Sequence, residues 1–407
     1  MVLFFTSAYN AESTLQRAID SVKAQTYGEW MWQLVDNGSS DNTGVIIQHA
    51  AATDGRIVAY TNKKNHVWES GNSWWDTVQK YYDSDFLCFL DADDEYIPDF
   101  LEKMLEFTMK KNLEIGICGS EFIDASNGKT LVFRRLDQCL IFDSPDDFST
   151  LFPQYHQFMR TTWGKLYKLN VVKQFDWKRV PPLRYGWDTL FTQEMFRNAS
   201  RVGILTEALH RYYISPKSAS YLFDNTRIES DRQLFKASRE FLIEKNGCLS
   251  PKNEEFIFHV YMNAIIETLN VHLNSDAPDV EKLVTVLNVF NHEYTKQLAS
   301  FEKIGFFNNG SLFVNQRRNL FATTAKWLIN HMDSQGDNTE RLCDVGEFIC
   351  ETAEAPEDWI WFEKLRCRYL IEMDREDEAK PRIEELHELL PNDEEMKNFI
   401  NYCQMLH

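Results

Sequence analysis

The sequence predicts an α/β fold with a mostly parallel, doubly wound sheet, followed by an all-helical region. Short apolar runs alternate with amphipathic helical patterns over roughly the first hundred residues, the pattern of strand–helix–strand units with right-handed crossovers. After about Arg227 the strand patterns end, and apolar residues recur at helical spacing. Polar turns follow three of the predicted strands, and they mark the edge of the sheet where a ligand is expected.

The first half is predicted from apolar periodicity and turn residues. Its strands are expected at residues 2–5, 31–35, 57–60 and 86–90. Three helices are expected between them: one capped by Asn10, one begun at Asp41, and one from about Ser70 to Tyr82. This order brings the carboxyl ends of the parallel strands to one edge of the sheet.

The next stretch predicts a helix after Pro98, a strand at residues 115–119 and a hairpin at Asn127-Gly128. A further helix follows Asp188, which is either its cap or a functional residue. An aromatic segment at residues 162–167 is either a structural aromatic pair or, as a resemblance to a known family implies, a segment that precedes an acceptor site, and the two readings have about equal weight.

Composition narrows the class of protein. A chain of 407 residues is expected to form two or three domains, and its formal charge of -19 argues against binding nucleic acid by bulk electrostatics. Its 8 cysteines are scattered, which favours a reduced cytoplasmic protein over a disulfide scaffold. No apolar run reaches the length of a transmembrane helix, and no signal peptide is expected. Peripheral contact with the inner face of a membrane stays open.

An acidic turn follows the buried strand at residues 86–90. Asp91, Asp93, Asp94 and Glu95 repel one another unless a cation is shared, and hard oxygen ligands favour Mg²⁺ or Mn²⁺. Taken alone, such a turn is more often a solvated helix cap. The two other polar turns, which begin at Ser7 and Asp36, favour the metal reading.

If the three turns converge, they suit a nucleoside diphosphate. Tyr9 beside Ser7 would stack on the base, and Asp36 would accept a hydrogen bond from a uracil or guanine N–H. Asp91 would hold ribose hydroxyls, and Asp93 would carry the metal that neutralises the diphosphate. Each residue alone is also explained as a turn residue or a helix cap.

These motifs resemble those of the inverting, GT-A fold glycosyltransferases of family 2. The resemblance rests on residues 7–10, 35–43 and 89–94 and covers roughly residues 1–220. It implies transfer of a hexose from a UDP-sugar, favoured over a GDP-sugar, to a hydroxyl of a glycan or lipid-linked acceptor. Surface polysaccharide or glycoconjugate synthesis is the implied process. Gly71-Asn72 departs from the Arg-Asn that many members carry.

The resemblance also gives Asp188 a catalytic role. Members usually have Glu-Asp here, and the Asp of that pair is the general base that takes the proton of the acceptor hydroxyl. Trp187 replaces the Glu and is expected to form a platform for the acceptor sugar. Asp188 and the metal at Asp93 would then divide base catalysis from stabilisation of the leaving diphosphate.

The predicted domains are a catalytic domain at 1–225, a helical region at 226–332 and a weakly tetratricopeptide-like region at 339–407. The catalytic domain divides into a nucleotide-sugar half at 1–98 and an acceptor half at 99–225. Self-association or a protein partner of the last helices is one hypothesis, and a bundle that completes the fold is another. The alternative function is a catalytically decayed sugar-nucleotide-binding scaffold. A nucleotidyltransferase is disfavoured because no Gly-rich phosphate loop follows the first strand.

Overall fold

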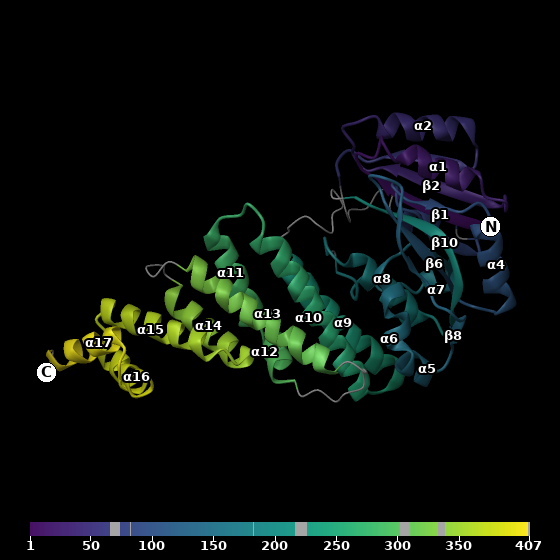
Figure 1. Cartoon of the computed structure of the whole chain (residues 1–407). Coiled ribbons are helices and arrows are strands. Elements are labelled where there is room, and N and C mark those ends of the chain that lie inside the picture. The colour runs from purple at the N-terminus through teal and green to yellow at the C-terminus, as the bar shows by residue number, and fades with distance from the viewer. Residues whose placement is uncertain are drawn as a thin grey trace. The chain divides into compact units, whose positions relative to one another are not determined.

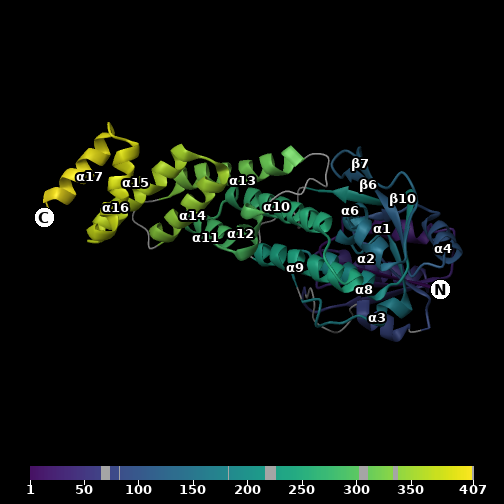
Figure 2. The ribbon, with the colours of Figure 1, turned by 90° about the horizontal axis from the view of Figure 1, so that it is seen from below.

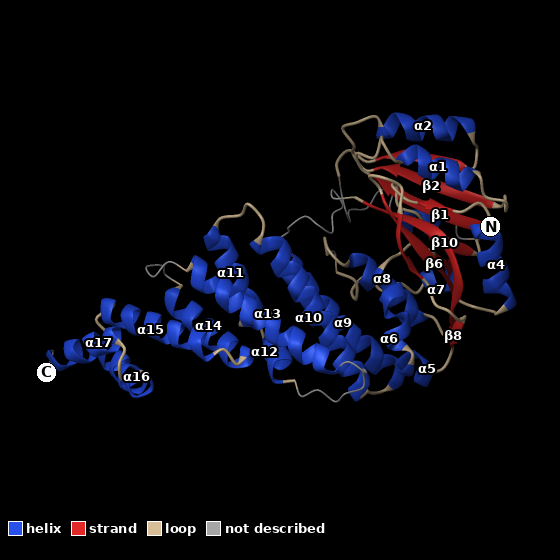
Figure 3. Ribbon diagram, in the orientation of Figure 1, coloured by secondary structure: helices blue, strands red, loops and turns tan. Residues whose placement is uncertain are grey.

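The computed structural model describes residues 1–65, 74–81, 83–181, 183–215, 226–301, 310–332 and 338–405 (Figure 1). The chain divides into two compact units, residues 1–254 and 255–407. Strands occur in the first unit, and every described element from α9 onward is a helix (Figure 3). None of the described helices is long and apolar enough to cross a bilayer.

The first unit is built on one mixed sheet. Among the described residues it has 10 strands, whose main path runs β3-β2-β1-β4-β9-β6-β10-β5. The strands are β1 Val2–Ala8, β2 Trp30–Asp36, β3 Ile57–Thr61, β4 Phe86–Phe89, β5 Glu95–Tyr96, β6 Ile115–Asp124, β7 Thr130–Arg134, β8 Leu140–Phe142, β9 Lys165–Lys168 and β10 Val202–Ile214.

Strand direction differs between the two halves of the sheet. β1 pairs in parallel with both β2 and β4, and β2 with β3. Antiparallel β9 lies between β4 and β6, so β6 runs in the direction of β4, and β10 is parallel to β6. The carboxyl ends of β1, β2, β4, β6 and β10 therefore share one edge of the sheet.

Most helices of this unit connect its strands, and the longest, α9, follows the last strand. They are α1 Leu15–Lys23, α2 Thr43–Thr53, α3 Trp74–Lys80, α4 Phe100–Lys110, α5 Pro145–Thr150, α6 Phe152–Tyr155, η1 His156–Arg160, α7 Leu169–Val172, α8 Trp187–Asn198 and α9 Arg227–Asn246. Figure 1 shows α1 and α2 on the same side of β1 and β2.

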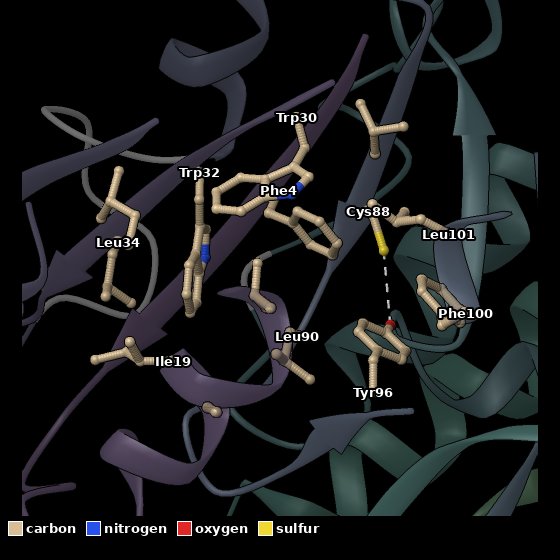
Figure 4. Packing of buried hydrophobic residues seen from close by; sticks show 14 of the residues in the cluster. Phe4, Ile19, Trp30, Trp32, Leu34, Cys88, Leu90, Tyr96, Phe100 and Leu101 are labelled. Carbon is tan, nitrogen blue, oxygen red and sulfur yellow. Dashed lines mark hydrogen bonds between the residues drawn. The ribbon is translucent and has the colours of Figure 1, made fainter. Parts of the chain in front are cut away.

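Alternate strand residues face opposite layers of helices. Phe4 packs with Trp30 and Trp32, at ring-centroid distances of 6.3 Å, in the core that α1, α2 and α4 cover (Figure 4). Phe5 and Phe89 face the other way, and Phe89 meets the α8 ring of Phe191 at 5.2 Å. A two-residue period thus buries the central strands on both faces.

Buried polar groups in the core are paired across elements. The indole N–H of Trp32 donates to Thr6 Oγ1 at 3.1 Å, and the Thr6 hydroxyl donates to the carbonyl of Leu90 at 2.6 Å. The Tyr96 hydroxyl donates to the carbonyl of Phe89 at 2.7 Å and accepts the Gly164 N–H at 2.8 Å. These bonds fix the position of the chain just before Asp91.

Most predicted elements are found within a few residues of their expected bounds. The predicted hairpin at Asn127-Gly128 is confirmed by the antiparallel pairing of β6 and β7. The prediction that Asn10 caps the first helix is wrong, because α1 begins at Leu15 and Asn10 has a positive φ of 50°. Residues 66–73, which hold Gly71-Asn72 and the predicted start of α3, lie outside the described residues.

The helical run begins at Arg227, near the expected change of character. Helix α9 nevertheless belongs to the first unit, where it packs against α5 and α8. The predicted boundary at residue 225 follows the composition of the chain, whereas the compact unit ends at Glu254 because α9 completes its core. The other predicted boundaries stay predictions.

The second unit contains α10 Pro251–Leu273, α11 Asp279–Phe290, α12 Glu293–Ser300, α13 Gly310–His331, α14 Thr339–Ala353, α15 Pro356–Glu372, α16 Glu376–Leu389 and α17 Glu394–Met405, with the first residues of α10 in the first unit. From α13 to α17 each helix packs against the next (Figure 2). An ion pair between Arg366 and Glu347 joins α15 to α14, and an ion pair between Glu363 and Arg382 joins α15 to α16.

Tyr96→Phe tests the buried hydroxyl described above. The ring and its stack on Phe100, at 3.7 Å between centroids, would stay, but the Gly164 N–H would lose its partner. We expect the free energy of unfolding to fall by about 1–3 kcal/mol, the cost of a buried unpaired polar group. Chemical denaturation measures it, with the exposed Tyr402→Phe as control. Equal stability of Tyr96→Phe and the wild type would contradict this account.

Candidate active site

The turns after β1 and β2 are bonded to each other. The Asn10 side-chain oxygen accepts the Ser40 N–H at 2.9 Å, and the Asn10 N–H donates to Ser39 Oγ at 3.0 Å. The Asn37 N–H donates to the carbonyl of Ala8 at 2.7 Å. Asn10 therefore joins two loops rather than capping a helix, and the expected convergence of these two turns is confirmed.

Asp36 is held at the base of the second turn. Its side chain is buried, and one carboxylate oxygen accepts the Ser39 N–H at 2.9 Å. A Cβ added at Gly44 would lie only 2.7 Å from the other oxygen of Asp36. A residue without a side chain is therefore required at position 44, in the first turn of α2. Ser7 and Tyr9 are exposed at the end of β1. A fixed carboxylate and an exposed aromatic ring thus flank the same strand ends.

Residues 91–94, the acid loop, follow β4. Asp91, Asp93 and Asp94 each place a carboxylate oxygen within 4.8 Å of the others, with Asp91 and Asp93 exposed and Asp94 buried. Desolvation by the surrounding protein raises the pKa of Asp91 well above its usual range. The negative charges of Asp188 and Asp93 raise it further. Three oxygens this close, two of them open to solvent, fit a divalent cation of the Mg²⁺ or Mn²⁺ type.

Arg17 of α1 holds the backbone of the acid loop. Its guanidinium donates to the carbonyl of Asp93 and lies 3.6 Å from the ring centroid of Tyr213. Its charge opposes the effect of burial, which raises the pKa of Asp93. Apolar periodicity gave no signal for Arg17, because the residue lies off the apolar face of its helix. Only the path of the loop shows its role.

Asp94 anchors the acid loop to β10. One oxygen accepts the Tyr213 N–H at 3.0 Å, and the other lies 3.3 Å from His210 Nε2 without hydrogen-bond geometry. Burial raises the pKa of Asp94 and lowers the pKa of His210. Both groups are thus driven toward their neutral forms, and the contact is not a full ion pair.

Glu95 and β10 complete this anchor. Glu95 accepts a hydrogen bond from the Tyr213 hydroxyl at 2.8 Å and from Arg211 at 3.0 Å. Arg211 also pairs with Glu121 of β6 at 3.2 Å. Glu95, the last residue of the predicted acidic cluster, therefore has a structural role as the ion-pair partner of Arg211.

Asp188 lies in the first turn of α8. The N-cap of this helix is Gly186, whose φ is 81°, so Asp188 is not the cap. Its carboxyl is half-buried, and burial raises its pKa to about 6, while the charge of Lys165 opposes the shift. The charge of Asp188 reaches Asp91 and raises the pKa of that residue. The structure thus brings the predicted base to the acid loop.

Trp187 precedes Asp188 in the chain, and the charge of Lys165 acts on the Asp188 carboxyl group. Trp187 is only 9% exposed, and its ring stacks on Phe191 with centroids 5.1 Å apart. Lys165 is buried and donates to the carbonyls of Thr161 and Trp163 at 2.6 and 3.0 Å. Burial lowers the pKa of Lys165 well below its usual range. The sequence pattern of residues 162–167 gives a signal for the aromatic residues but none for Lys165.

The predicted site residues share one edge of the sheet. Ser7, Tyr9, Asp36, Asp91 and Asp93 follow three adjacent parallel strands, and α8 adds Asp188. Their individual roles stay predictions.

The sequence of this chain is similar to those of known glycosyltransferases. Residues 4–176 match the family model described as "Glycosyl transferase family 2". The uncharacterized glycosyltransferase EpsJ of Bacillus subtilis is 25% identical over 219 residues, which cover 54% of this chain and 62% of EpsJ. The chain thus spans less than two thirds of that relative's length.

Two further proteins are similar over different spans. WfgD of Escherichia coli, a UDP-Glc:alpha-D-GlcNAc-diphosphoundecaprenol beta-1,3-glucosyltransferase, is 32% identical over 124 residues, 30% of this chain and 47% of WfgD. The crystal structure of S. aureus TarS 1-349 in complex with UDP-GlcNAc has 14% identity and a TM-score of 0.45, covering 90% of this chain and 91% of that one.

Asp93→Asn tests the repulsion within the acid loop. Removing the carboxylate of Asp93, whose charge raises the pKa values of Asp91 and Asp94, should raise the midpoint of thermal unfolding of the metal-free protein, measured in EDTA. Asp137→Asn, at an exposed position outside the loop, is the control and should leave the midpoint unchanged. A midpoint lowered by Asp93→Asn would show that the carboxylate makes a stabilising contact instead.

Proposed function

Because residues 4–176 belong to glycosyl transferase family 2, we propose that this chain is a metal-dependent inverting glycosyltransferase. It transfers a hexose from a nucleoside diphosphate sugar to a hydroxyl of a glycan or lipid-linked acceptor. The observation that carries the proposal is the acid loop and Asp188 at one edge of the sheet, within electrostatic reach of each other. A decayed scaffold would have no need to keep both.

The donor is held by the turns after β1, β2 and β4. Tyr9 lies against the base, Asp36 accepts its N–H, and Asp91 binds ribose hydroxyls. Asp93 holds the divalent cation, with Asp94 and Arg17 fixing the shape of the loop. When bound, the cation neutralises the diphosphate and stabilises the charge of the leaving group.

Asp188 acts on the acceptor. It takes the proton of the acceptor hydroxyl as that oxygen attacks the anomeric carbon, while the bond from that carbon to the diphosphate breaks on the opposite face. A pKa of about 6 leaves Asp188 mostly ionised at neutral pH and still basic enough to accept a proton. Inversion at the anomeric carbon follows from the single displacement.

The sequence relative WfgD supports a UDP-sugar over a GDP-sugar in this proposal. WfgD is named for a UDP-glucose donor and a diphosphoundecaprenol-linked acceptor. We infer surface polysaccharide or glycoconjugate synthesis at the cytoplasmic side of a membrane for this chain. The second unit is then a site for self-association or a protein partner.

Nucleotide binding gives the first test. We expect UDP with Mn²⁺ to raise the thermal stability of the wild type, by roughly 2.7 kcal/mol at about a hundred times the dissociation constant. GDP should give a smaller shift, and Asp93→Ala should abolish the effect of Mn²⁺. Differential scanning fluorimetry with UDP, GDP and their sugars measures this.

The controls separate the cation from the nucleotide. EDTA should remove the shift of the wild type, and Asp137→Ala should respond as the wild type does. The donor site is assigned wrongly if no nucleotide diphosphate stabilises the wild type at millimolar concentration.

Asp188→Asn tests the general base. Loss of the base should lower kcat by about 10²–10⁴-fold while the stabilisation by donor is retained. For the wild type, kcat should rise with pH as Asp188 loses its proton and level off above a pKa of about 6. Release of UDP measures turnover. Unchanged kcat in Asp188→Asn would exclude Asp188 as the base.

A further inference from the structure

A cluster of aromatic rings is built on the elements that carry Asp91 and Asp188. Phe89 precedes Asp91 by two residues, Phe191 follows Asp188 by three, and the two rings meet at 5.2 Å. Trp74, the first residue of α3, packs edge-on against Phe191 at 5.0 Å and Phe89 at 6.3 Å. These three rings form an aromatic layer that is attached to β4 and α8, the elements that position Asp91 and Asp188.

Trp177 extends the cluster to the surface. Its indole stacks on Trp74 with centroids 5.6 Å apart and an interplanar angle of 23°. The rings of Phe175 and Trp75 approach it edge-on, at 4.9 and 6.0 Å. Trp177 is still 45% exposed, although Trp74 stacks on its indole.

The turn that carries Trp177 is fixed at both ends. The Arg179 N–H donates to the carbonyl of Asp176 at 3.0 Å, and the Asp176 side chain accepts the Lys178 N–H at 2.9 Å. The Arg179 guanidinium pairs with Glu244 of α9 at 2.8 Å. A flat apolar surface is thus presented to water in one orientation, and little ordering is needed before a ligand binds.

We propose that the exposed face of Trp177 is the sugar-binding platform of the acceptor subsite, taking one pyranose ring of a glycan. The inference rests on the proposed glycosyl transfer and specifies its acceptor. A pyranose has a face of C–H groups that packs on an aromatic ring, while its hydroxyls project from the rim. A ring stacked on Trp177 would lie on the aromatic layer that continues to Phe191, one helical turn from Asp188.

Trp187 is less suited to this role. Its indole is 9% exposed and is already stacked on Phe191, so neither face has room for a sugar. We therefore assign the acceptor platform to Trp177 instead of Trp187. Trp187 is a packing residue of α8.

The test is direct binding of simple sugars. Methyl glycosides of β-glucose, β-galactose and N-acetyl-β-glucosamine serve as probes, and saturation-transfer NMR detects the ring C–H groups that contact the protein. The protein is kept with UDP and Mn²⁺ under the conditions of the stabilisation test. We expect saturation of C–H groups on one face of at least one probe. The affinity of the protein for that probe should fall roughly tenfold in Trp177→Ala, and Trp177→Phe should largely restore it.

Matched variants decide the result. Tyr402→Ala removes a ring that is 41% exposed in the second unit, and it should leave saturation unchanged. Stabilisation by UDP should be unaffected in Trp177→Ala, which separates loss of the platform from loss of the fold or the donor site. Saturation that persists in Trp177→Ala, or no saturation of any probe while UDP still binds, would overturn the proposal. Failure of UDP to bind the wild type would instead count against the proposed function.

Discussion

The main physical constraint on the first unit is the repulsion between carboxylates at the carboxyl edge of its sheet, which the surrounding contacts must overcome. Asp91, Asp93 and Asp94 place oxygens within 4.8 Å of one another, which costs free energy in the absence of a cation. The loop keeps its shape because Arg17 binds the Asp93 carbonyl and the N–H of Tyr213 binds Asp94. Helix α1 and strand β10, far apart in the sequence, therefore hold one functional loop. Strain of this kind is tolerated where the surrounding structure determines the conformation.

The sequence was sufficient for features that local pattern decides. The strand ends at Ser7, Asp36 and Asp91 follow from apolar runs that stop at polar turns, and their convergence follows from parallel neighbours. Features that depend on pairing across the fold were not predictable. Arg17 has no special position in its own helix, and Asn10 reads as a helix cap until the Ser40 turn is placed beside it. The antiparallel β9 between two parallel strands likewise leaves no local signal.

Burial accounts for the altered pKa values of the ionisable groups at the site. Desolvation is the first cause of the raised pKa of Asp188, whose helix also carries Phe191, a ring that packs with Phe89 and Trp74. The same rings belong to the face of the sheet opposite to Phe4 and Trp32. One face of the central strands thus packs against α1, α2 and α4, while the other packs against rings carried by α3 and α8.

Trp at position 187 is compatible with the proposed role of Asp188 as a base. The family that the sequence motifs resemble usually has Glu at this position, and a second carboxylate next to Asp188 would raise the pKa of Asp188 further by like-charge repulsion. Trp187 instead packs on Phe191, one turn further along α8. Asp188 is left with burial as the main influence on its pKa and with Lys165 as the opposing charge. Because these two effects partly offset each other, the pKa stays near 6, where a carboxylate is ionised at neutral pH and still able to accept a proton.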